Sequence, residues 1–90
     1  MTDTEKIATL VQAEALVDHS QSVKMAKRSE MKALFRATAK RIISRSNDDI
    51  YTAVSEAKAS LPSVGPREAD QIIKVGFDIV MDEAIAMNNS

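Results

Sequence analysis

The sequence predicts an all-α protein, a single domain with four helices in a small bundle. The chain has only two glycines and two prolines, and three of these four residues fall within positions 61–66. Alanine, the best helix former, is the commonest residue, with 13 copies. Apolar residues recur at helical spacing along most of the chain. Ninety residues without cysteine form one domain with a modest core, and no disulfide can reinforce it.

The first helix is expected near residues 3–18. Thr2 and Glu5 have the spacing of a capping box, and apolar residues follow at helical spacing. The polar run at 18–22 has low helix propensity, so we expect a break near 19–22, with an Asp or Ser capping the next helix. One unbroken helix with a solvated middle is the alternative, because a heptad register starting at Ile7 is apolar at both of its ends.

The second helix is expected near 22–46 and the third near 48–61. One narrow sector of the second helix carries its core face: Met31, Leu34, Phe35, Thr38 and Ile42. Asn47 is expected to cap the third helix, and Asp48 and Asp49 to lie in its first turn, where carboxylates suit the helix dipole.

The fourth helix is expected near 66–87. Pro62 ends the helix before it, and Pro66 suits a first helical position. Apolar residues cover more than one stripe of this segment, which predicts a central helix or a dimer interface. Gly76 lowers helix stability by about 1 kcal/mol relative to alanine, so we expect another helix to approach it closely.

The predicted core combines the apolar faces of the four helices. It consists of Ile7, Leu10, Val11, Val17, Met31, Leu34, Phe35, Ile42, Ile50, Val54, Leu61, Ile72, Ile73, Phe77 and Val80.

Residues 24–45 carry eight Lys and Arg side chains and one Glu, although the whole chain has a net charge of -1. Five of these cations recur every four residues and form what we call the basic stripe: Lys24, Arg28, Lys32, Arg36 and Lys40. Such a row suits an anionic partner, either nucleic-acid phosphates or an acidic protein. The competing interpretation is a solvated helix face, partly neutralised by an antiparallel last helix through Asp70, Asp78, Asp82 and Glu83.

Small residues occupy another side of the same helix: Ala26, Ser29, Ala33, Ala37 and Ser44. They allow close packing of a second helix, as in a homodimer. Alanine's helix propensity predicts the same pattern on a solvent face, so both interpretations stay open.

The sequence predicts no catalytic, cofactor-binding or metal-binding residues. The chain has no Cys and one His, which removes thiolate sites and His clusters. Asp18, His19 and Ser20 are consecutive, and neighbours on a helix point about 100° apart, so they cannot act as a triad. The acidic pairs at 48–49 and 82–83 do not supply the 6 to 8 oxygens that calcium prefers.

These observations favour a small non-enzymatic interaction or regulatory protein that presents helix faces to a protein partner or, as a homodimer, to itself. The alternative is a nucleic-acid-binding module that uses the basic helix at 24–45. The acidic N-terminus lacks the pattern of a secretory signal, and the longest apolar runs are too short to span a bilayer. We therefore expect a cytoplasmic protein without a membrane partner.

Overall fold

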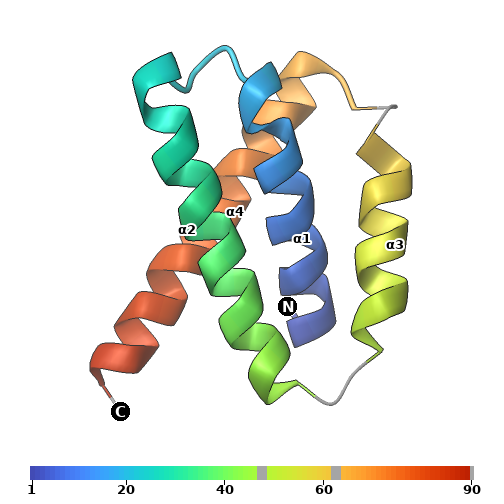
Figure 1. Cartoon of the computed structure of the whole chain (residues 1–90), viewed down its shortest axis with the longest axis vertical. Helices are drawn as coiled ribbons and strands as arrows, with labels where there is room; N and C mark the ends of the chain where they lie inside the picture. Colours follow the sequence, from blue (N-terminus) through green and yellow to red (C-terminus); the bar gives the residue numbers. More distant parts are fainter. Residues whose placement is uncertain (47–48, 62–63, 90) are drawn as a thin grey trace.

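The computed structural model describes residues 1–46, 49–61 and 64–89. These residues form an all-α domain, which confirms the predicted fold class. Its elements are α1 (Asp3–Leu16), a short 3-10 turn η1 (Val17–His19), α2 (Met25–Arg45), α3 (Ile50–Ser60) and α4 (Pro66–Asn88). In Figure 1, α1 and α3 run upward, and α2 and α4 run downward.

Helix α1 lies at the centre of the domain, where it packs against α2, α3 and α4. Its start is the predicted capping box: Glu5 N donates to Thr2 Oγ1 at 3.1 Å, and Thr2 N donates to Glu5 Oε1 at 3.2 Å. Ile7, Leu10, Ala13 and Leu16 are buried. Since α1 contacts all three other helices, it is the central helix of the bundle. The sequence had indicated the fourth helix as a candidate for this position.

The predicted break between the first two helices is confirmed, and the unbroken helix is ruled out. Ser20, only 4% exposed, organises the turn. Its hydroxyl donates to Asp70 Oδ1 at 2.6 Å and accepts from the amides of Ser22 and Val23, both at 3.0 Å. The expectation that an Asp or Ser caps α2 is wrong. Its N-cap is Lys24, without a side-chain hydrogen bond, because the serines at 20 and 22 are engaged by the turn and by Asp70.

Helix α4 crosses α2 instead of lying along it (Figure 1). Gly76 lies where α4 approaches both α1 and α2: a Cβ atom there would be 2.9 Å from Ala13 Cβ and 3.2 Å from Phe35 Cε1. The predicted close approach at Gly76 is therefore confirmed.

The prediction that Leu34 and Phe77 belong to the core is wrong, because both side chains are exposed. Each lies on the flank of its helix, beside the face that is buried at the crossing. Two crossing helices separate on either side of their closest approach, so residues on these flanks are only partly covered.

Helix α3 packs chiefly against α1. Its N-cap is Asp49, whose side chain accepts from Thr52 N at 3.3 Å and Thr52 Oγ1 at 2.6 Å; these hydrogen bonds lower the pKa of Asp49. Asp49 is thus the cap and not a first-turn residue, while Asn47 and Asp48 lie outside the described residues. Helix α4 begins with Pro66 at its first position, as predicted.

The rest of the predicted core is buried or partly buried. Buried are Ile7, Leu10, Val17, Phe35, Ile42, Ile73 and Val80, and partly buried are Val11, Met31, Ile50, Val54, Leu61 and Ile72. The structure adds buried residues that the sequence did not single out, among them Ala13, Leu16, Ala39, Ala69 and Ile79.

Candidate interaction surface

The middle of the basic stripe faces α1 and the turn that follows it. Arg28 Nη2 donates to the Ser20 carbonyl at 3.1 Å. Lys32 Nζ lies 2.9 Å from Asp18 Oδ2, and this hydrogen bond lowers the pKa of Asp18. Arg36 Nη2 lies 2.5 Å from Glu14 Oε1. The two ends of the stripe, Lys24 and Lys40, are exposed.

The stripe is therefore partly neutralised, but by different acids from those expected. Glu14 and Asp18 come from the first helix and its continuation, whereas the sequence predicted acids of the last helix in an antiparallel arrangement. That arrangement is wrong: α2 and α4 run in the same general direction and cross (Figure 1). Asp70 accepts hydrogen bonds from Ser20 and Ser22 instead of pairing with the stripe.

One acid of α4 does contact a cation of α2, beyond the stripe. Arg45 Nη1 lies 2.6 Å from Glu83 Oε1 and forms an ion pair with it. Arg45 Nη2 donates to Asp3 Oδ1 at 3.2 Å, and hydrogen bonding from Arg45 lowers the pKa of Asp3. Since Glu83 is only 5% exposed, this network joins three helices and holds one side of the second half of α4 against the bundle.

The five small residues that the sequence places on one side of α2 are all exposed in the single chain: Ala26, Ser29, Ala33, Ala37 and Ser44. Solvent exposure fits both interpretations of this face, close packing of a second copy and simple helix propensity.

Ser20 and His19, which follow each other in the turn after α1, have different surroundings. The Ser20 hydroxyl donates a hydrogen bond to Asp70, while His19 is exposed. In the part of the chain that the structure describes, no group of three or more His, Asp or Glu side chains is placed to hold a metal ion. No helix in the same residues is both long enough and apolar enough to cross a membrane.

An exposed apolar surface is the clearest candidate site, and we call it the α2/α4 surface. It comprises Leu34 of α2, which is 42% exposed, and Phe77, Met81 and Ile85 of α4, which are 39%, 48% and 54% exposed. Phe77, Met81 and Ile85 are spaced four residues apart, so they follow one side of α4. Past their crossing, α4 diverges from α2 (Figure 1), and all three of these α4 side chains are exposed among the described residues.

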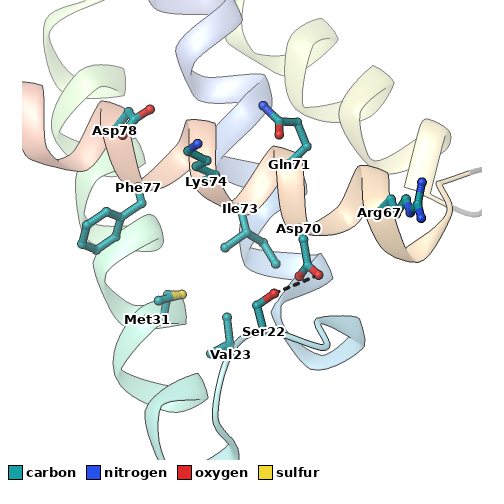
Figure 2. Close-up of a pocket in the computed structure, with 10 residues that line it drawn as sticks. All are labelled: Ser22, Val23, Met31, Arg67, Asp70, Gln71, Ile73, Lys74, Phe77 and Asp78. Carbon is teal, nitrogen blue, oxygen red and sulfur yellow. Dashed lines mark hydrogen bonds between the residues drawn. The ribbon is translucent and has the colours of Figure 1, made fainter.

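A cavity of about 630 Å³ adjoins this surface between α2 and α4. Figure 2 shows its apolar side chains, Val23, Met31, Ile73 and Phe77, gathered around one space. Polar and charged residues of α4 complete the lining, among them Asp70, Gln71, Lys74 and Asp78. The cavity therefore has apolar walls and a charged rim, the arrangement common in binding sites.

Sequence reasoning missed the acids that neutralise the stripe and the exposure of the α2/α4 surface. A signal for the surface was present, because α4 carries more apolar residues than one core stripe needs. No comparable signal marked Glu14 and Asp18, which reach the stripe only through tertiary packing.

No protein-family model matches the chain, and neither curated proteins nor solved structures gave a significant match.

Proposed function

We propose that this protein is a small non-enzymatic interaction protein that works as a homodimer through the α2/α4 surface. The observation that carries the proposal is the exposure of Phe77, Met81 and Ile85, which lie four residues apart along one side of α4. Contiguous apolar side chains at a protein surface are typical of interaction sites, because covering them releases water from apolar area.

The position of these residues supports an interaction role over a purely structural one. They lie beside the core, yet the four helices leave them uncovered. A second copy can supply the missing cover, because a two-fold dimer uses the same patch on both subunits. A monomer of this size also has a limited core of its own, so added burial contributes appreciably to its stability.

The non-enzymatic part of the proposal rests on the side chains available. The chain has no cysteine. Its one histidine is exposed and precedes Ser20, whose hydroxyl donates a hydrogen bond to Asp70. The alternative role in binding nucleic acid depends on the basic stripe, and three of its five cations already have partners in the fold.

Sedimentation equilibrium from about 1 to 100 µM tests the proposal, since this range covers dissociation constants typical of modest interfaces. We expect the wild type to dimerise and the double variant Met81→Gln, Ile85→Gln to be monomeric. Both residues are about half exposed, so the variant should keep its helical circular dichroism. Met25→Gln is the matched control, because Met25 is 81% exposed at the start of α2.

Two outcomes would contradict the proposal. One is a wild-type protein that stays monomeric at the highest concentration. The other is a double variant that dimerises as strongly as the wild type, which would place the contact on another surface.

A further inference from the structure

We propose that two copies join with their α4 helices antiparallel, so that Met81 and Ile85 of each copy enter the cavity between α2 and α4 of the other. This inference rests on the proposed homodimer and adds its orientation, its register and the charges that select it.

The first argument is complementary shape. The cavity of about 630 Å³ has apolar walls from Met31, Ile73 and Phe77 and opens at the surface of the domain. Met81 and Ile85 project from α4 just beyond this cavity, about half exposed. One chain thus carries both an apolar hollow and the apolar side chains to fill one, which is what a self-complementary two-fold contact needs.

The second argument is register. Ile73 and Phe77 of the cavity are four residues apart, and so are Met81 and Ile85. When two such helices run antiparallel, a single alignment places Met81 of the second copy on Phe77 and Ile85 of the second copy on Ile73. The two-fold axis then passes at the level of residue 79. Both contacts form twice in the dimer, once in each cavity.

The third argument is charge. On the exposed side of α4, Lys74 lies in the first half, where Arg67 and Glu68 offset each other, and the acids Asp78 and Asp82 lie in the second half. The chain has no Lys or Arg after Lys74. In the antiparallel register, Lys74 lies within two residues of the level of Asp82 in the second copy, about 3 Å along the helix axis. A parallel dimer would instead set like charges against each other.

Charge reversal tests the orientation. Lys74→Glu sets a carboxylate opposite Asp82, and Asp82→Lys sets an ammonium group opposite Lys74, so each variant alone should dimerise more weakly than the wild type. Two such contacts occur per dimer, and an exposed pair contributes about 0.2 to 1 kcal/mol, so we expect a loss of roughly two- to thirtyfold in affinity. An equal mixture of the two variants should restore dimers, because the introduced glutamate of one chain then faces the introduced lysine of the other.

Cysteine cross-linking gives an independent measurement, because the natural chain has no cysteine. We expect a short bis-maleimide to join Lys74→Cys chains to Asp82→Cys chains in a mixture, and to join either variant to itself much less. Ala33→Cys, on the exposed face of α2, is the control for random collision.

The outcomes separate this inference from the proposed function. A wild-type monomer removes both. A dimer in which each Cys variant cross-links to itself but not to the other is parallel and overturns the inference alone. A dimer that is unaffected by either charge reversal, and shows no cross-link above the Ala33→Cys control, also overturns it while leaving self-association in place.

Discussion

Replacing Gly76 by alanine tests how tightly α4 packs against α1 and α2. Two effects of the substitution oppose each other. Alanine raises helix stability by about 1 kcal/mol relative to glycine. The added Cβ would lie 2.9 Å from Ala13 Cβ and 3.2 Å from Phe35 Cε1, closer than such atoms normally approach.

Neither neighbour can move easily. Ala13 Cβ is fixed to the backbone of the central helix, and the Phe35 ring is fully buried. Overpacking of this kind destabilises by about 1 to 3 kcal/mol, so we expect overpacking to exceed the gain in helix propensity. The net result should be a loss of about 1 kcal/mol in the free energy of unfolding, which lowers the melting temperature by roughly 4 to 8 °C in a domain of this size.

Urea unfolding followed by circular dichroism measures the effect, and a double-mutant cycle assigns its cause. Ala13→Gly removes the nearer of the two close atoms, so the double variant Ala13→Gly, Gly76→Ala should be more stable than the sum of the single changes predicts, by about 1 kcal/mol. If Gly76→Ala raised stability, or if the two changes were additive, the close approach at Gly76 would not limit the packing.

Four further predictions concern other parts of the molecule. In denaturant unfolding, Phe35→Ala should destabilise the protein by about 3 to 5 kcal/mol, because the ring is fully buried, whereas Ala33→Ser on the exposed face should change the stability by less than about 1 kcal/mol. Equally small effects of the two changes would show that the core face of α2 is assigned to the wrong side. Hydrogen bonds from Arg45 and Lys32 lower the pKa values of Asp3 and Asp18 in the folded protein, so these two ionised carboxylates stabilise the fold above about pH 4, and this contribution is lost as the pH falls through the lowered values. The melting temperature should therefore drop between about pH 4 and 2, and it should drop less in the variant Asp18→Asn. We expect the wild type to bind DNA and RNA weakly or not at all at physiological salt, and replacing Arg28, Lys32, Arg36 and Lys40 by Gln should not change this. If the wild type instead bound nucleic acid with a log-log salt slope of about -3 to -4, and the four changes abolished that binding, these cations would have a nucleic-acid role. Asp78→Asn should tighten the antiparallel dimer about two- to fivefold in sedimentation equilibrium, because the two Asp78 side chains lie near its two-fold axis, and a weaker dimer would argue against that register.

The sequence by itself determined the four helices and their limits to within a few residues, because these depend on local interactions. The capping box at Thr2 and Glu5 and the proline at position 66 act within one turn of helix, so their effects can be read from neighbouring residues. The polar run at 18–22 marked the break for the same reason. Periodicity also gave the correct direction of the core face at Phe35 and Ile42.

Only the tertiary structure decided which flanks of those faces are covered and which charges meet. Helical periodicity gives the direction of an apolar face but not the angle at which two helices cross, and the crossing of α2 and α4 leaves Leu34 and Phe77 exposed. The acid that pairs with Lys32 is 14 residues away, and the one that pairs with Arg36 is 22 residues away. The sequence could not predict these pairs, because which helices become neighbours depends on packing of the whole chain.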